Sequence, residues 1–134
     1  MNDTKRVDAF PISGKEARAR KELIRIPPED MLHTIRGKDH PVLVSYFVSN
    51  DFCHMGTVTV PTGEGARFSE PVSHKGDMVA LVQRGPMTFF LPAAGQTFVV
   101  EEGDAMFIPE ETEYQCVNYT AHPVTAVFMI APGP

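Results

Sequence analysis

The chain has 134 residues, of which 43% are hydrophobic and 22% are charged, a composition typical of one globular domain. Its formal net charge of -5 disfavours a nucleic-acid surface, which needs clustered lysine and arginine. No apolar run approaches the roughly 18 residues of a membrane span, and the N-terminal sequence MNDTKRVDAF lacks the apolar core of a secretory signal. Two cysteines, Cys53 and Cys116, suggest reduced, buried thiols and not a disulfide framework. We therefore expect a cytoplasmic protein that binds neither nucleic acid nor membrane.

Residues 1–40 differ from the rest of the chain and are expected to form an N-terminal arm. Ser13 followed three residues later by Glu16 has the form of a capping box, which predicts a short helix that ends at the proline pair Pro27-Pro28. A second short helix is predicted over residues 28–37. The apolar residues on one face of this second helix are Met31, Leu32 and Ile35.

From residue 41 onward the pattern changes to short apolar stretches separated by turn residues. Eight strands are predicted, over residues 41–49, 53–60, 77–83, 86–92, 97–102, 104–109, 113–119 and 123–132. Regularly spaced short strands of this kind fit a jelly roll of two facing sheets. The expected fold class is therefore all-β, with residues 41–134 as a barrel preceded by the arm.

Two stretches within these strands, residues 78–82 and 124–131, are apolar almost throughout. A strand with one solvent-exposed face alternates apolar and polar residues, so these stretches indicate a sheet that is covered on both faces. Either the N-terminal arm or a second subunit could supply the outer cover. We expect a two-fold homodimer.

The most specific spacing in the chain lies between Gly103 and Asn118. Gly103, Pro109 and Asn118 match the second motif of the cupin superfamily, which reads Gly, five residues, Pro, one, Gly, two, His, three, Asn. The run from His74 to Gly85 resembles the end of the first cupin motif in the same way. The chain therefore resembles a cupin, and this resemblance implies a double-stranded β-helix, the jelly-roll barrel of that superfamily.

The resemblance also implies four metal ligands in the barrel, and three of their positions carry other residues here. Val72 stands at the first metal histidine, Met78 at the glutamate and Tyr114 at the histidine of the second motif, so His74 alone remains. Glu111 likewise replaces a motif glycine. Iron, manganese, nickel or zinc needs several nitrogen or anionic oxygen donors, which valine and methionine do not provide. We expect no cofactor and no metal at the inherited site.

A rearranged metal site remains an alternative. Its candidate ligands are His54, His74, Asp77 and Tyr114, with Glu70 and Cys116 near them in the sequence. Asp77 is an awkward ligand because successive residues of a strand point to opposite faces, and position 78 is the inward one. For His54 the simpler interpretation is a hydrogen-bonded histidine at the start of a strand.

His74 and Tyr114 occupy inward positions of the motif and are the candidate catalytic residues. Imidazole titrates near neutrality and a phenol donates a hydrogen bond or a proton, so the pair could act as base and acid; alternatively, both only line a pocket. The expected ligand-contacting residues are Met55, Met78, Phe89, Met106 and Cys116, with Phe107 beside them. Such a wall suits an aromatic or terpene-like ligand, whose carboxylate Arg67 or Arg84 could neutralise.

We therefore predict a cupin that binds a small organic molecule, aromatic or carboxylate-bearing, in a metal-poor and largely apolar barrel. The first alternative is a metal-independent isomerase, lyase or cyclase that uses His74 and Tyr114 as base and acid. The second is a metal-dependent dioxygenase or decarboxylase with rearranged ligands, and the third is a sensor or accessory module that binds another protein. The fold alone does not identify the ligand, because jelly rolls host unrelated functions.

Overall fold

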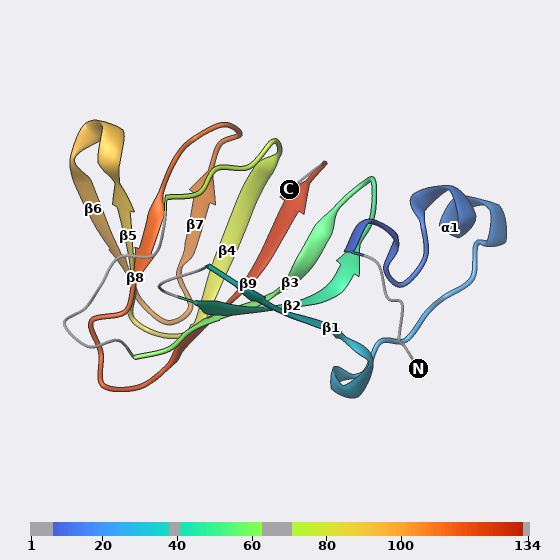
Figure 1. Cartoon of the computed structure of the whole chain (residues 1–134), viewed down its shortest axis with the longest axis horizontal. Helices are drawn as coiled ribbons and strands as arrows, with labels where there is room; N and C mark the ends of the chain where they lie inside the picture. The colour runs from blue at the N-terminus through green and yellow to red at the C-terminus, as the bar shows by residue number, and fades with distance from the viewer. Residues whose placement is uncertain (1–6, 38–40, 63–70, 133–134) are drawn as a thin grey trace.

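The computed structural model describes residues 7–37, 41–62 and 71–132, which form two antiparallel sheets beside an N-terminal arm (Figure 1). The strands are β1 (Leu32–Arg36), β2 (Val42–Ser49), β3 (His54–Val60), β4 (Asp77–Arg84), β5 (Met87–Leu91), β6 (Gln96–Val100), β7 (Ala105–Ile108), β8 (Gln115–Val117) and β9 (Val124–Ala131). The larger sheet has the order β1-β2-β3-β9-β4-β7 and the smaller one β6-β5-β8. Because β9 lies between β3 and β4, distant parts of the chain pair as a jelly roll requires. The predicted all-β jelly-roll barrel is confirmed.

The eight predicted strands are all present, and β1 appears where the second short helix was predicted. That helix prediction is wrong, because only the 3-10 helix η2 (Pro28–Asp30) forms there. The five residues of β1 pair in register with β2, from Leu32 opposite Tyr46 to Arg36 opposite Val42. A short helix has little intrinsic stability, so pairing with a neighbouring strand outweighs the helical preference that the spacing of the apolar residues suggests. The larger sheet thus begins inside the segment that the sequence assigned to the arm.

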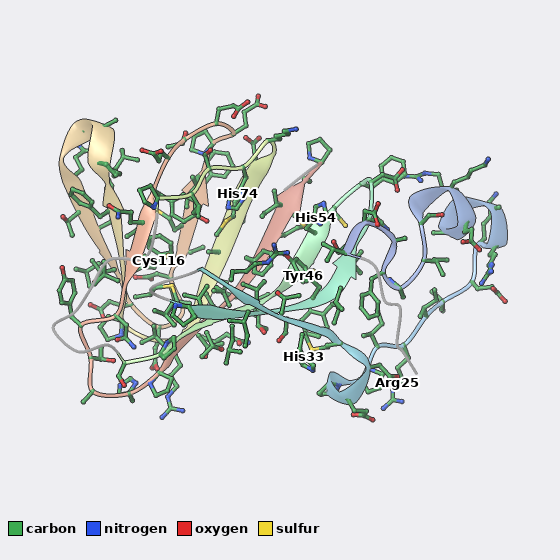
Figure 2. All side chains as sticks on the ribbon, in the orientation of Figure 1. Arg25, His33, Tyr46, His54, His74 and Cys116 are labelled. Carbon is green, nitrogen blue, oxygen red and sulfur yellow. The ribbon has the colours of Figure 1, made fainter. Side chains whose placement is uncertain are left out.

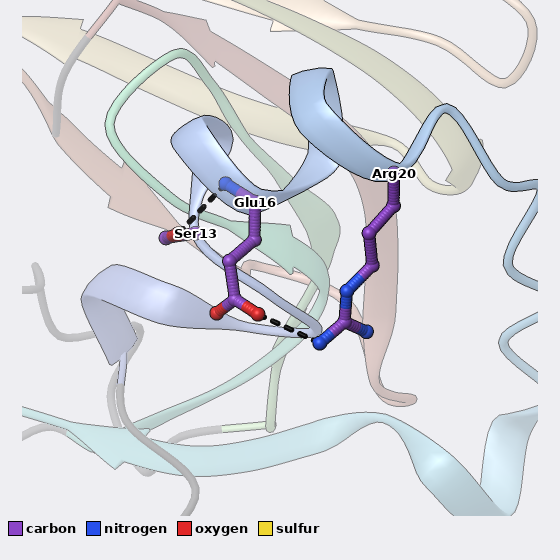
Figure 3. A network of polar contacts seen from close by, with 3 residues as sticks. All are labelled: Ser13, Glu16 and Arg20. Carbon is purple, nitrogen blue, oxygen red and sulfur yellow. Dashed lines mark hydrogen bonds and ion pairs between the residues drawn. The ribbon is translucent and has the colours of Figure 1, made fainter.

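The first predicted helix does form, as α1 (Gly14–Arg20), after the short 3-10 helix η1 (Val7–Ala9). The N-cap half of its capping box is confirmed, because the Ser13 hydroxyl accepts a hydrogen bond from the Glu16 backbone N–H at 3.2 Å (Figure 3). Glu16 also pairs with Arg20 one turn later at 2.7 Å. The helix ends at Lys21, whose φ is 53°. The predicted stop at the proline pair is therefore wrong. Among the described residues no helix is long and apolar enough to cross a membrane.

The arm is attached to the end of β2 and to the turn that follows it. Phe10 and Ser49 exchange two backbone hydrogen bonds, of 2.8 and 2.7 Å. The Gly14 N–H donates to Oδ1 of Asp51 at 2.8 Å, and a Cβ on Gly14 would lie only 2.4 Å from the Phe52 ring. A side chain at position 14 would displace the side chains of Asp51 and Phe52, and the arm is held beside Ser49.

The larger sheet buries one face against the smaller sheet. One row across this inner face consists of Tyr46, Gly56, Phe128, Ala80 and Met106. A second row consists of Ser49, His54, Ile130, Met78 and Ile108. The core is built on these rows together with Met87, Phe89 and Val100 of the smaller sheet. Every side chain in the second row is buried, so this row forms part of the barrel wall.

Candidate functional site

Backbone hydrogen bonds bring His74 and Tyr114 together although 40 residues separate them. Val72 and Tyr114 form an isolated antiparallel bridge, in which each backbone N–H donates to the other residue's carbonyl oxygen with a nitrogen–oxygen distance of 2.9 Å. Three residues before Tyr114, the backbone N–H of Glu111 donates to the His74 carbonyl oxygen at 2.7 Å. The two motif segments are therefore clamped to each other on both sides of the pair.

The side chains of the pair form a short hydrogen-bonded chain. His74 Nε2 lies 2.7 Å from Tyr114 Oη, and the same oxygen lies 3.3 Å from Met78 Sδ. A thioether sulfur is a weaker acceptor than an imidazole nitrogen, so we assign the phenolic proton to His74 Nε2. The proton of neutral His74 is then on Nδ1. Three positions at which the cupin pattern implies metal ligands are thus joined to one another.

Burial keeps these groups uncharged near neutral pH. Burial lowers the pKa of His74 below its ordinary value, and the nearby His54 lowers it further. Burial raises the pKa of the Tyr114 hydroxyl far above its ordinary value, with a smaller effect from Cys116. The pKa of the Cys116 thiol is raised to about 12 by burial as well. The site therefore offers hydrogen bonds to a ligand, and not a formal charge.

A second histidine faces the same interior. His54 opens β3, and its Nδ1 lies 2.7 Å from the Ser49 hydroxyl oxygen. Its ring meets the Tyr46 ring edge-on at 6.4 Å. Burial lowers the pKa of His54 too. His54 and His74 lie toward the same end of the sheets in Figure 2. The prediction of a hydrogen-bonded histidine at a strand start is confirmed, whereas Ser49 was missed.

Ser49 faces His54 because β2 contains a bulge. The register shifts between Tyr46 and Val48, which brings Ser49 and not Val48 opposite His54. One signal for the bulge was present in the sequence, the glycine Gly56 inside a strand. A Cβ at this glycine would lie 1.9 Å from the Ser45 carbonyl oxygen, so the β2 backbone approaches too closely for any side chain.

Four of the five predicted ligand-contacting residues lie in or against the core, and one does not. Met78 and Phe89 are buried, while Met106 and Cys116 are partly buried and pack against the core. The Phe89 ring lies 6.1 Å from the Tyr114 ring, and Phe89 pairs with Cys116 in the smaller sheet. The ligand-contacting role of these four residues stays a prediction.

The assignment of Met55 and Phe107 to the barrel lining is wrong. Met55 stands between the inward residues His54 and Gly56, and therefore points to the outer face. Phe107 is exposed on the same outer face. Phe98, which the sequence did not single out, lies opposite Phe89 on the same face of the smaller sheet, but it is 43% exposed.

The residues at the cupin ligand positions do not fit a metal ion. The Nε2 lone pair of His74 is directed at Tyr114, and the Val72 side chain has no donor atom. Asp77 is exposed and accepts a hydrogen bond from the Glu110 backbone at 2.9 Å, as expected for the outward position next to Met78. Within the described parts of the chain, no three or more His, Cys, Asp or Glu residues gather as a group able to hold a metal ion.

Two further candidates fall outside the described residues, and one lies away from the core. Glu70, a possible ligand of a rearranged metal site, and Arg67, a possible partner for a carboxylate, both lie in the segment that the structure does not describe. Arg84 is exposed at the end of β4. Of these two candidate arginines, the structure thus describes Arg84, and its side chain is exposed to solvent.

Comparison with known proteins rests on structure, since no family model and no curated protein matches the chain. The polyketide cyclase RemF from Streptomyces resistomycificus is similar with a TM-score of 0.69 and 18% identity, over 84% of this chain and 82% of RemF. An RmlC-like cupin from Shewanella frigidimarina has a TM-score of 0.62 and 14% identity, over 82% of this chain and 92% of that one. A cupin domain from Bordetella pertussis has a TM-score of 0.54 and 15% identity, over 81% of this chain and 98% of that one. The chain has the cupin fold, as its motif spacing predicted.

Proposed function

We propose that the protein binds a small, neutral and largely apolar organic molecule inside the barrel, against His74 and Tyr114. The observation that supports this most is the 2.7 Å hydrogen bond between these two uncharged side chains, beside the buried Met78 and Phe89. Apolar walls with a few convergent polar groups are typical of small-molecule sites. Methionine and aromatic side chains also adapt to ligands of irregular shape.

The polar groups of the interior favour a neutral ligand. Among the described residues, the buried polar side chains are Ser49, His54, Thr88 and Asn118. Asn118 bonds the Val60 and His122 carbonyl oxygens at 3.0 and 2.8 Å, and so fixes the turn before β9. A carboxylate in this interior would lose its water, and Arg36, a described cation that contacts an inward side chain, already bonds the Tyr46 hydroxyl at 3.2 Å. Of the two predicted ligand types, the neutral aromatic one is therefore the one we propose.

The methionines allow a direct test with para-hydroxyacetophenone, a neutral aromatic ketone, as the probe. We label the methionine methyl groups isotopically and follow their NMR signals during a titration. The signals of Met78 and Met106 should move, because these residues face the interior. Met55 and Met129 on the outer face are the internal controls and should not move. An unchanged spectrum, or changes confined to the outer pair, would contradict binding in the barrel.

Acid and base catalysis by the same pair is the second candidate function. His74 would take a proton from carbon next to a carbonyl group, while Tyr114 donates its proton to the carbonyl oxygen that gains charge. The hydrogen bond between the two side chains and the likeness of the fold to a polyketide cyclase favour this candidate, although a shared fold alone is a weak guide to function. The test is exchange of the methyl protons of para-hydroxyacetophenone in deuterium oxide, followed by NMR. Exchange that the protein accelerates, and that His74→Gln abolishes, would establish catalysis.

For the outer face of the larger sheet we propose a second copy of the chain as the cover. One exposed row across it consists of Met55, Met129, Val79 and Phe107, and Leu81 is exposed beside them. Apolar patches of this kind mark interaction surfaces. In a two-fold dimer the same patch meets itself, and an uncharged patch does so without repulsion.

Sedimentation of two matched variants tests the dimer. Met129→Lys places a charge in the middle of the outer face and should give a monomer. Val99→Lys places the same charge on the smaller sheet, at a side chain that is also exposed, and should leave the dimer intact. A monomeric wild-type protein, or a dimer that tolerates Met129→Lys, would contradict the proposal.

A further inference from the structure

The hydroxyl group of Ser49 determines which nitrogen of His54 carries the proton. Ser49 is 0% exposed, and among the described residues its hydroxyl has one hydrogen-bond partner, Nδ1 of His54 at 2.7 Å. If Nδ1 carried the proton, the serine hydroxyl would accept it and its own proton would be buried without an acceptor. Since an unsatisfied buried donor is costly, Ser49 donates and Nδ1 accepts. Neutral His54 then carries its proton on Nε2.

This Nε2–H group has no acceptor among the described residues. His54 is 4% exposed, but no fully buried side-chain nitrogen or oxygen of the described residues lacks a partner, so Nε2 stays accessible to a ligand or water. It lies in the inner row with Ile130 and Met78, and the Met78 sulfur is the atom that contacts Tyr114 Oη. His54 and His74 also lie toward the same end of the sheets (Figure 2). A fixed hydrogen-bond donor therefore faces the same interior as the His74–Tyr114 pair.

We propose that His54, oriented by Ser49, is a second ligand-contacting residue that selects molecules with a carbonyl oxygen. This inference rests on the proposed binding function. Its Nε2–H donor is open to an acceptor, and a ketone, ester or amide oxygen supplies one without introducing charge. A carboxylate fits less well, because Arg36, the cation that the described residues place at this part of the wall, bonds the Tyr46 hydroxyl at 3.2 Å. The ligand class is thus a small aromatic or otherwise apolar carbonyl compound.

The test compares para-hydroxyacetophenone with para-isopropenylphenol, which has the same shape but carries a methylene group in place of the carbonyl oxygen. The wild-type protein should prefer the ketone by about 3- to 10-fold, as expected for one hydrogen bond. His54→Phe should abolish this preference, and His54→Gln, which keeps an N–H donor, should retain part of it. Ser49→Ala should weaken it, because the ring loses the contact that fixes its proton.

The chain contains a matched control on its outer surface. His33 Nδ1 lies 2.7 Å from the Ser45 hydroxyl in the pair formed by β1 and β2, but this histidine is exposed. His33→Phe and Ser45→Ala should leave the ketone preference unchanged. The inference is contradicted if both probes shift the Met78 signal equally well in wild type, or if the preference survives in His54→Phe. If neither probe shifts Met78 or Met106, the proposed binding function itself fails.

A measurement on the free protein tests the inference without any ligand. Nitrogen NMR of the histidine rings distinguishes a proton on Nε2 from one on Nδ1. We expect His54 to carry its proton on Nε2 alone in wild type, and to show a mixture of the two tautomers, as a free imidazole does, in Ser49→Ala. A proton on Nδ1 in the wild-type protein would overturn the assignment of His54 as a donor, whether or not any variant folds poorly.

Discussion

The backbone N–H of Glu111 donates to the carbonyl oxygen of His74 at 2.7 Å, while Glu111 itself has a φ of 60°. The turn that holds His74 beside Tyr114 therefore depends on a residue in the left-handed region, where a side chain is unfavourable. Glu111 stands where the cupin motif has glycine, and its backbone is left-handed.

Glu111→Gly should stabilise the protein by about 1 kcal/mol, because glycine adopts a positive φ without strain. Urea unfolding measures this change. Gly103→Ala is the opposite control, since Gly103 has a φ of 88° and no atom within 4 Å that a Cβ would meet. The alanine variant should be destabilised by strain alone. A lower stability of Glu111→Gly would mean that the glutamate side chain makes a compensating contact.

Stability should fall as the pH falls from neutral, because burial lowers the pKa values of His54 and His74. The unfolded chain binds protons at these residues from about pH 6.5 downward, whereas the folded chain resists protonation until the pH reaches the lower folded values. Their contribution is therefore complete above about pH 6.5 and is lost as the pH falls through the folded pKa values. This contribution is measured by thermal unfolding, as a function of pH, of wild type, His74→Gln and the exposed-site control His33→Gln. A slope against pH as steep in His74→Gln as in wild type would contradict this origin.

Protein purified without added metal should contain well below one equivalent of iron, manganese, nickel, copper or zinc. The reason is the donor set, in which the imidazole of His74 is joined to a phenol and a thioether. Elemental analysis after dialysis against a chelator is the measurement. Stoichiometric metal that survives this treatment would show that residues beyond the described ones complete a rearranged site.

Removal of residues 1–40 should cause aggregation, because it deletes β1 and exposes the edge of β2. A shorter truncation that removes residues 1–30 keeps β1 and is the matched comparison. It should aggregate less, although it loses the backbone contact between Phe10 and Ser49. Size-exclusion chromatography separates the outcomes. A soluble, equally stable dimer after the longer truncation would show that this segment is dispensable.

The strands could be predicted from the sequence because their signal is local. Alternating apolar residues and turn residues mark each strand, and the spacing of Gly103, Pro109 and Asn118 identified the cupin barrel. β1 could not be predicted in this way, since Leu32 and Ile35 also fit a helical face. Its strand conformation comes from pairing with β2, which is a tertiary interaction.

Within the site, motif positions predicted that His74 and Tyr114 face inward, and the structure joins them directly. The assignment of Met55 to the same interior failed because the face of a strand residue depends on register, and one residue of shift reverses it. Ser49 was missed for the same reason, since a bulge in β2 turns it toward His54. Spacing along the chain therefore predicts the orientation of the motif residues better than it predicts the orientation of the residues around them.

The central claim is that a ligand contacts the His74–Tyr114 pair, and paired titrations with para-hydroxyacetophenone and acetophenone test it most directly. The first probe carries a hydroxyl group that can bond the pair, and the second lacks it. Tyr114→Phe and His74→Gln should each weaken binding of the hydroxyl-bearing probe by about 1 to 3 kcal/mol and leave binding of acetophenone nearly unchanged. A pure binding protein should not accelerate proton exchange measured on the same samples. If the protein is a catalyst, each substitution should instead slow exchange by about 100-fold and leave the affinity for the probe within a few-fold of wild type. Unchanged affinity of both probes in both variants would contradict the claim.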